Sequence, residues 1–386
     1  MIPLKYNVRN LRVRWVNTLM TVLGTGLVVW SSCILFGLVD GLQHSLRVSG
    51  DPLDLIIMRK GSTAETNSGF SLKTADQITT LSGIAKQDGL SLVAKEMLNI
   101  PIAERNDGSR TNIIVRGISP ASSKLRPQFT IVQGRDLETG KGEAVVSLNL
   151  ARRFKGASLG GTLKVGEKES YRVVGVFTAG GSAAESEVWV DIKDLERNMG
   201  REGYVSSVQL RAASAADLEA IKKTIEGDTQ FKLSALRESD YFSSQSQSSL
   251  FLKGAGTLIA VLLTIGAMFA AANTMYAAVS ARTREIGTLR ALGFSRFDIL
   301  VSFLGESVLL CTLGGVLGLL ATIPLSALTY GTSNFNTFAE VTVNFRFGPL
   351  VMLVAVLMTI AMGIFGGLFP AMRAVRMDVI SALREL

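Results

Sequence analysis

Residues 254–281 read GAGTLIAVLLTIGAMFAAANTMYAAVSA and contain no charged side chain. About 20 consecutive apolar residues form a helix long enough to cross the roughly 30 Å of hydrocarbon in a bilayer. Three other segments of the chain are uncharged over a comparable length: Asn17–Val39, Ser307–Ala339 and Phe347–Met372. The sequence therefore predicts four membrane-spanning helices.

The composition agrees with a membrane protein. Of the 386 residues, 47% are hydrophobic and 19% charged, and the mean hydropathy is +0.33. Basic residues precede the first uncharged segment, as they do in a signal peptide. However, its apolar stretch exceeds the usual 7 to 15 residues, and no A-x-A-like cleavage site closes it. We expect it to remain as an uncleaved helix.

The net charge of +8 does not form one stripe of the kind that binds nucleic acid, so no nucleic-acid partner is expected. If the spans alternate, three basic groups fall on one side of the membrane, while the short opposite loop carries only Arg346. By the positive-inside rule, both termini are cytoplasmic and residues 40–250 are extracytoplasmic. The basic groups are Lys5, Arg9, Arg12 and Arg14; Arg282, Arg284, Arg290 and Arg296; and Arg373, Arg376 and Arg384.

The extracytoplasmic segment has a different texture, because short β-branched or alternating runs are separated by glycines. It predicts an α+β domain of about two hundred residues, with two lobes as one option. Thr162–Val165 and Tyr171–Phe177 flank Gly166 as a hairpin, and Ser214 or Asp217 can cap a helix at Ala215–Ile225. The other expected strands are Leu53–Met58, Met97–Ala103, Thr111–Ile118, Phe129–Val132, Ala144–Ser147, Glu187–Val190 and Ser206–Arg211, and the other helices are Leu72–Leu81, Leu148–Phe154 and Ile192–Met199.

These patterns divide the chain into segments, and the fold class is an integral membrane α-helical protein with a large α+β domain between helices 1 and 2. Leu236–Leu252 is interpreted as a stalk that extends span two, with a flexible linker as the alternative. The expected segments are a cytoplasmic amphipathic helix at 1–16 (or the basic flank of an anchor), spans at 17–39, 251–279, 301–330 and 347–372, the external domain at 40–250, a cytoplasmic helix at 280–300, a short external loop at 331–346 and a cytoplasmic tail at 373–386.

Small residues stand four apart in three of the spans, which permits close approach of helix backbones and is compatible with a dimer. The pairs are Gly314 and Gly318, Gly363 and Gly367, and Ala267 and Ala271.

The chain carries no recognisable catalytic, cofactor or metal site. No G-x-x-x-x-G-K-[ST] motif occurs, and Gly140-Lys141-Gly142 is only a fragment of one. H-E-x-x-H, C-x-x-C and G-x-S-x-G are also absent, and His44 is the single histidine. Cys33 and Cys311 lie inside spans, where they behave as small apolar residues. Glu185 and Glu187 are interpreted as solvated surface carboxylates rather than as an acid/base pair.

Glu306 is the one charged residue within the predicted third span, and it lies near the cytoplasmic end of this span. An acidic side chain within a membrane suggests a proton or cation site, so a secondary carrier is one interpretation. The structural alternative is that Glu306 reaches the interface or pairs with a nearby arginine, because it follows Asp298 by only about two helical turns.

The loop between spans two and three, SARTREIGTLRALGFSRFDIL at residues 280–300, is the most informative segment. Its apolar residues recur at helical spacing, and charged residues occupy the other faces. Gly293 is expected to end this helix. The alternative is an interfacial loop lying on lipid. The apolar set is Ile286, Leu289, Leu292, Phe297 and Leu300, and the charged set is Arg282, Arg284, Glu285 and Arg290.

This loop resembles the R-x-x-E-I-G-x-L-R-A-L-G signature of the FtsX-like, MacB-type permeases of ABC transporters, the type VII superfamily. The tail FPAMRAVRMDVISALREL resembles the family's closing P-A-x-x-A-x-x-x-x-P-x-x-A-L-R pattern, but Asp378-Val379 lacks the usual proline. Further similarity lies in GRDLETGKGEAVVSLNLARRF and LGGTLKVGEKESYRVVGVF of the external domain, in Glu306-Ser307 and in the LGGVLG after it. The resemblance covers nearly the whole chain.

The resemblance implies a homo- or heterodimer of permeases in the bacterial inner membrane, bound to cytosolic ATPase subunits that supply ATP and Mg²⁺, with a membrane-fusion or periplasmic adaptor as a further partner. It implies export or extraction of a drug, peptide, lipid or lipoprotein by mechanotransmission. The alternative within the family is signalling to an external partner such as a cell-wall hydrolase. The ATPase-coupling residues it implies are Arg282, Arg284, Glu285, Ile286, Leu289, Arg290, Leu292 and Phe297.

Overall fold

The computed structural model describes residues 15–167, 169–245, 247–327, 329–333 and 339–377. The predicted amphipathic helix at 1–16 therefore lies almost wholly outside the described residues, as does the tail beyond residue 377. The chain forms two compact units. One comprises Met1–Gly41, Phe251–Leu328 and Phe345–Leu386, and the other comprises Leu42–Leu250 and Thr329–Asn344.

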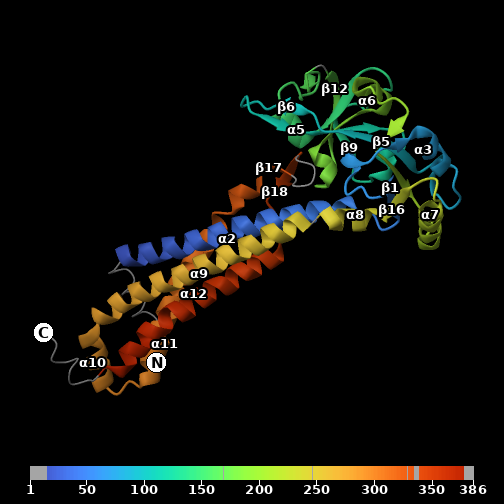
Figure 1. The fold of residues 1–386 in the computed structure, drawn as a ribbon. Coiled ribbons are helices and arrows are strands. Elements are labelled where there is room, and N and C mark those ends of the chain that lie inside the picture. Colours follow the sequence, from blue (N-terminus) through green and yellow to red (C-terminus); the bar gives the residue numbers. More distant parts are fainter. Residues whose placement is uncertain (1–14, 168, 246, 328, 334–338, 378–386) are drawn as a thin grey trace. The chain divides into compact units, whose positions relative to one another are not determined.

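In the described part of the chain, the first unit contains four long apolar helices, which confirms the predicted spans as elements (Figure 1). They are α2 (Trp15–Ser49), α9 (Gln247–Ser280), α11 (Arg296–Leu320) and α12 (Pro349–Arg376), with the short α10 (Thr283–Ala291) between α9 and α11. The first helix continues well past the uncharged run that predicted it. The third ends at Leu320, earlier than the expected residue 330, and a 3-10 turn, η3 (Ile323–Ala327), follows.

Glycines let the helices of this unit approach closely. A Cβ atom added to Gly314 of α11 would overlap Thr25 Oγ1 and lie 2.6 Å from the carbonyl oxygen of Val22, both on α2. A Cβ atom on Gly363 of α12 would lie 2.7 Å from the Cα atom of Val308 on α11. The small residues noted in the sequence thus serve contacts within one chain.

Gly314→Ala is expected to destabilise the protein by about 1–3 kcal/mol, because the new methyl group has no room between α2 and α11. Gly305→Ala is the matched control, since nothing lies within 4 Å of a Cβ atom at this position of the same helix. The control should be neutral or stabilising by up to about 1 kcal/mol. Thermal unfolding of the two purified variants in detergent checks the prediction, and equal midpoints would contradict it.

The second unit is an α/β domain built on a long mixed sheet. The strand order is β11-β12-β10-β13-β8-β5-β15-β1-β16, and β9 also pairs with β12. The strands of this sheet are β1 (Asp54–Arg59), β5 (Val93–Asn99), β8 (Ile114–Ile118), β9 (Thr130–Gly134), β10 (Glu143–Ser147), β11 (Thr162–Val165), β12 (Glu169–Thr178), β13 (Glu187–Asp191), β15 (Ser207–Arg211) and β16 (Leu233–Arg237).

Shorter elements complete this unit. The helices and 3-10 turns are η1 (Glu65–Asn67), α3 (Leu72–Thr79), α4 (Ser122–Leu125), α5 (Leu148–Arg153), η2 (Ala183–Ser186), α6 (Ile192–Met199), α7 (Ala215–Gly227) and α8 (Glu238–Gln245), and the minor strands are β2 (Phe70–Ser71), β3 (Lys86–Gln87), β4 (Leu90–Ser91), β6 (Ile102–Glu104), β7 (Arg110–Asn112), β14 (Tyr204–Val205), β17 (Thr329–Ser333) and β18 (Glu340–Asn344).

The domain contains two large hydrophobic cores, which we call its lobes, and Ile192 of α6 packs against both. One core, the β12 lobe, is formed by β8, β10, β12 and β13 with α5 and α6, and its buried side chains include Tyr171 and Val190. The other core, the β1 lobe, is formed by β1, β15 and β16 with α3 and α7, and it includes Ile57 and Ile221. The lobes share one sheet, which crosses between them where β5 pairs antiparallel with β8. We call this strand pair the seam.

Local sequence signals placed several of these elements well. The hairpin around Gly166 is confirmed by β11 and β12, and α6 has the predicted bounds. The hydroxyl of Ser214 accepts the N–H of Asp217 and caps α7, as one of the two predicted caps. The expected strand at Met97–Ala103 is wrong, because β5 ends at Asn99 and β6 begins at Ile102, on either side of Ile100 and Pro101. Proline lacks the N–H that a ladder needs.

Two elements escaped the sequence prediction. The start of the expected stalk at Leu236 is instead the end of strand β16, and helix α8 begins at Glu238. The sequence prediction assigned residues up to 330 to span three and residues 331–346 to a short loop. The structure instead has the antiparallel strands β17 and β18 in this region. This hairpin belongs to the same compact unit as the external domain.

Candidate functional site

A buried ion pair fixes the start of α10. Arg282 is the N-cap residue of α10, and its guanidinium donates to both oxygens of Glu306 on α11, at 2.8 and 3.0 Å. The two side chains are only 5% and 4% exposed, and the guanidinium lies 5.8 Å from the ring centroid of Phe303. The bidentate geometry satisfies the carboxylate. The orientation of α10 is thereby tied to α11.

The remaining residues that the resemblance implied for ATPase coupling divide into a buried and an exposed set. Ile286 is 2% exposed and packs with the apolar cluster of Ile299 and Phe303. In contrast, Leu292 and Phe297 are 73% and 70% exposed. Arg284 and Glu285 are exposed, and Leu289 and Arg290 are half-buried. Arg284 and Glu285 lie on α10, Leu292 directly follows it, and Phe297 lies in the first turn of α11. We call these four exposed residues the α10 face.

The geometry assigns different parts to these residues. Arg282 and Ile286 act within the chain, because their side chains are buried against α11 and its surroundings. Gly293 has a φ of +95°, a left-handed conformation that suits glycine and ends the helical turn after Leu292. Contact of the α10 face with an ATPase stays a prediction.

Arg282→Leu is expected to destabilise the protein by about 3–5 kcal/mol, because Glu306 would be left buried without its partner. The double variant Arg282→Leu/Glu306→Leu should recover most of this loss. Arg284→Leu serves as the control, since Arg284 is exposed on the same helix. Thermal unfolding in detergent measures the effect. Equal losses in Arg282→Leu and Arg284→Leu would show that the ion pair has no structural role.

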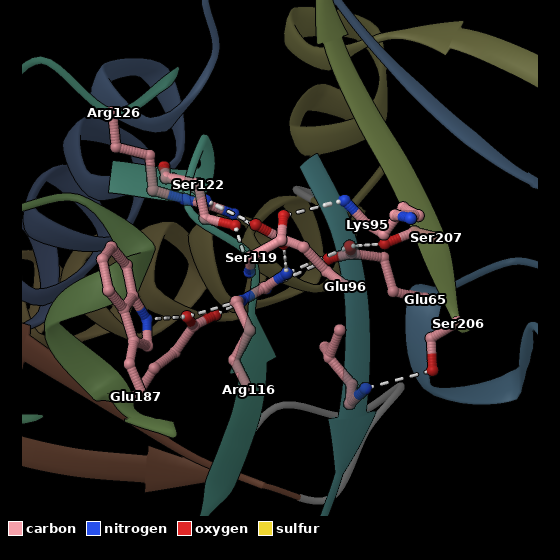
Figure 2. A network of polar contacts seen from close by, with 12 residues as sticks. Glu65, Lys95, Glu96, Arg116, Ser119, Ser122, Arg126, Glu187, Ser206 and Ser207 are labelled. Carbon is pink, nitrogen blue, oxygen red and sulfur yellow. Dashed lines mark hydrogen bonds and ion pairs between the residues drawn. The ribbon is translucent and has the colours of Figure 1, made fainter. Parts of the chain in front are cut away.

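A second cluster of charges lies at the seam of the external domain (Figure 2). Arg116 of β8 is 5% exposed and contacts three carboxylates from three other elements. Its guanidinium binds Glu187 of β13 through two bonds of 2.7 Å, Glu96 of β5 at 2.5 Å and Glu65 of η1 at 3.1 Å. Four segments that are distant in the sequence therefore meet at one cation.

Arg126 extends this cluster from the end of α4. It binds both oxygens of Glu96 at 2.7 and 2.9 Å, and its guanidinium lies 5.3 Å from the ring centroid of Trp189. Burial by itself raises the pKa of Glu96, but the charges of Arg126 and Arg116 outweigh it and lower the pKa to about 2. Glu96 is therefore ionised at neutral pH, as the two arginines require. We call these residues (Glu65, Glu96, Arg116, Arg126 and Glu187) the seam cluster.

The interpretation of Glu187 as a solvated carboxylate is wrong. It is 4% exposed and accepts a third hydrogen bond, of 2.8 Å, from the indole of Trp189. Glu185 also has structural partners, since it accepts the backbone N–H groups of Ala179 and Gly181 at 3.0 and 2.9 Å. Both residues are less exposed than the sequence suggested. The spacing of residues could not reveal this, because their partners are side chains remote in the sequence or backbone groups.

Glu238, the first residue of α8, lies beside the seam cluster. Its carboxylate accepts the N–H of Asp51 at 3.0 Å, which connects the start of α8 to the segment that follows α2. Burial raises the pKa of Glu238 to about 8, in spite of this hydrogen bond and with a further contribution from the charge of Asp54. A cavity of about 110 Å³ adjoins the carboxylate and is also lined by Arg116 and Arg126.

Stability of the external domain is expected to fall as the pH rises from about 4.5 to about 8. In this window the unfolded Glu238 is ionised while the folded residue keeps its proton, so the unfolded state binds fewer protons. Glu238→Gln should remove this fall and stabilise the domain by a few kcal/mol above pH 8, with little effect near pH 4.5. Glu167→Gln, at an exposed external position, is the control. Unfolding followed by tryptophan fluorescence against pH checks this, and parallel profiles of the two variants would refute it.

Among the described residues, no group of three or more histidine, cysteine, aspartate or glutamate side chains is arranged to hold a metal ion. The charged clusters are instead arginine–carboxylate sets, whose geometry suits rigid attachment of one element to another.

Comparison with known proteins agrees with this division into a membrane unit and an external domain. The family profile described as the MacB-like periplasmic core domain matches residues 18–227, and the profile of the FtsX-like permease C-terminal region matches residues 257–379. The first match alone covers more than half of the 386 residues.

Curated relatives named macrolide export ATP-binding/permease protein MacB share moderate identity with the chain. The protein from Rhodospirillum rubrum is 26% identical over 403 aligned positions, which cover 98% of this chain and 60% of the relative. The Bdellovibrio bacteriovorus protein is 27% identical, covering 71% and 44%. The chain thus spans about half the length of these relatives.

Among solved structures, the periplasmic region of MacB from Actinobacillus actinomycetemcomitans covers 53% of this chain and 98% of its own length, at 13% identity and a TM-score of 0.39. The extracellular domain of the ABC-type transporter YknZ from Gram-positive bacteria covers 47% and 99%, at 16% identity and a TM-score of 0.37. On the two family profiles, which together include most of the external domain and at least the greater part of each of the four spans, the chain belongs to the FtsX/MacB-type family of ABC transporter permeases.

Proposed function

We propose that this permease transmits movement from a cytosolic ATPase through its spans to the external domain. The observation that carries the proposal is the α10 face. Its apolar members are exposed at the junction of two helices, with Leu292 directly after α10 and Phe297 in the first turn of α11. The Arg282–Glu306 pair holds α10 in place. Exposed apolar side chains outside a bilayer are typical of protein contact surfaces. Because α10 is bonded to α11 through this pair, a displacement of α10 is transmitted to the helix bundle.

The charge distribution supports a cytoplasmic position for the α10 face. Arg284, Arg290 and Arg296 lie in or next to this loop, and Arg373 and Arg376 lie at the end of α12. Positive residues near the ends of spans favour the cytoplasmic side. Both termini are then cytoplasmic, and the domain between α2 and α9 is extracytoplasmic.

The cargo is proposed from the relatives. Their printed names refer to macrolide export, so export of a lipophilic compound by an ATP-driven dimer is the first candidate, with peptides, lipids or lipoproteins as further candidates. The carrier interpretation of Glu306 has little support, because Arg282 binds both of its oxygens. Transport into vesicles that contain the permease and its ATPase tests the export function. ATP turnover without movement of any candidate compound would instead favour signalling to an external partner.

Glu285→Arg and Phe297→Asp are each expected to weaken ATPase binding roughly tenfold or more, because charge reversal or a buried carboxylate at the contact costs at least about 1.4 kcal/mol. Glu167→Arg, a charge reversal on the external domain, should leave binding unchanged. Co-purification of the ATPase from native membranes and its permease-stimulated turnover measure the effect. Normal binding by both α10 variants would rule out this face as the ATPase contact.

A further inference from the structure

The 3-10 turn η2 lies between β12 and β13, and it contacts the end of the helix that contains span one. The backbone N–H of Ala183, the first residue of η2, donates to the hydroxyl of Ser49 at 2.7 Å. Ser49 is the last residue of α2. A shift of this helix end therefore acts directly on the beginning of η2.

The other end of the same turn contacts the hairpin between spans three and four. The hydroxyl of Ser186, the last residue of η2, accepts the backbone N–H of Thr342 at 2.7 Å. Thr342 lies on β18 and is 6% exposed. Within four residues, η2 thus has one contact to the α2 end and one to the β17–β18 hairpin.

The hairpin is also attached to the β12 lobe by buried charge. Glu340 of β18 is 1% exposed and forms ion pairs with Arg105 and Arg153, and the Nε atom of Arg105 lies 3.0 Å from Glu340 Oε2. Arg153 is the last residue of α5, and Arg105 directly follows β6. A Cβ atom on Gly331 of β17 would overlap Glu340 and Arg153, so the backbone of β17 packs directly against this ion pair. We call Glu340, Arg105 and Arg153 the socket.

The turn itself is held by Glu185. This carboxylate accepts the N–H groups of Ala179 and Gly181, and its second oxygen accepts the side-chain amide of Asn149 at 3.0 Å. These bonds link η2 to the preceding loop and to α5. Because it is fixed in this way, η2 is expected to move as one body when either of its ends is displaced.

The residue after η2 is Glu187, the bidentate partner of Arg116 in the seam cluster. A displacement of η2 therefore acts directly on the contact between the β12 lobe and the seam. The cavity of about 110 Å³ provides room for such a movement, since its lining includes Ser49, Ala183 and Glu187 together with Arg116.

We propose that η2 is the relay of the external domain, at which movement of span one and movement of the span three–span four hairpin combine and pass through Glu187 to the seam between the lobes. The relay rests on the proposed function for its driving movement. The proposal goes beyond that function because spans three and four also act on the domain, through Glu340 and Thr342. This input is separate from the chain connections at α2 and α8.

Hydrogen exchange in the purified full-length chain tests the convergence of the two inputs. Ser49→Ala removes the acceptor at one end of η2, and Glu340→Gln weakens the socket that holds the hairpin. Each is expected to raise amide exchange of residues 183–191 roughly fivefold, the effect of losing about one hydrogen bond. In the double variant, the increase in exchange rate should differ clearly from the product of the two single increases, because the free-energy changes of coupled sites are not additive. Ser186→Ala replaces Glu340→Gln if that variant folds poorly.

Glu104→Gln is the matched control, because Glu104 pairs with Lys155 at 3.2 Å on the exposed surface of the same lobe. Its exchange at 183–191 should equal that of the parent chain. The relay is overturned if Glu340→Gln and Ser186→Ala alter exchange only in the hairpin, or if the effects of Ser49→Ala and Glu340→Gln simply multiply. The exchange assay contains neither nucleotide nor ATPase, so a negative result there contradicts the relay and leaves the proposed function unaffected. Normal ATPase binding by the Glu285→Arg and Phe297→Asp variants would instead contradict the proposed function alone.

Discussion

The hydrocarbon core of a bilayer offers no water to a polar group, and this constraint governs the membrane unit. Backbone N–H and C=O groups must bond within each span, which favours long helices such as α2 and α12. Lipid tails are as apolar as the helix surfaces, so no hydrophobic effect drives the helices together and their association depends on close packing. Gly314 and Gly363 permit this close packing. Glu306 is tolerated in a span because Arg282 satisfies both of its oxygens. The same pair fixes α10, so the solvation requirement of one carboxylate also orients the proposed contact for the ATPase.

The external domain meets a similar requirement with a different set of groups. Arg116 brings together carboxylates from β5, β13 and η1 at the seam between the two lobes. Buried charge of this kind is costly when a partner is removed and adds little stability over an apolar core, so its value lies in specifying one geometry. The β17–β18 hairpin is held in the same manner by Glu340. The hairpin between spans three and four is thus attached to the rest of the external domain by directional contacts, which transmit displacement better than apolar packing that can slide.

The sequence predicted those features that depend on local patterns. Span length is a property of a single uncharged run, the hairpin at Gly166 follows from alternation around a glycine, and α6 ends at Gly200 with a φ of 62°. Glu187 was misjudged because its partner Arg116 is remote in the chain. The end of span three was misplaced because the uncharged run continues through the β17 strand. Glu340, an isolated acid followed by the alternating residues Val341–Asn344, is the signal in the sequence that could have revealed the hairpin.

The central claim is that nucleotide binding on one side of the membrane rearranges the lobes on the other. Spin labels at Ser158→Cys in the β12 lobe and Lys223→Cys in the β1 lobe occupy exposed positions, and replacement of the buried Cys33 and Cys311 leaves them as the only thiols. The distance between the labels is measured by pulsed electron resonance in the permease–ATPase complex, without nucleotide and with ATP trapped. We expect the distance distribution to shift on ATP trapping and expect Glu285→Arg to abolish this shift. Identical distributions in a complex that hydrolyses ATP would contradict it.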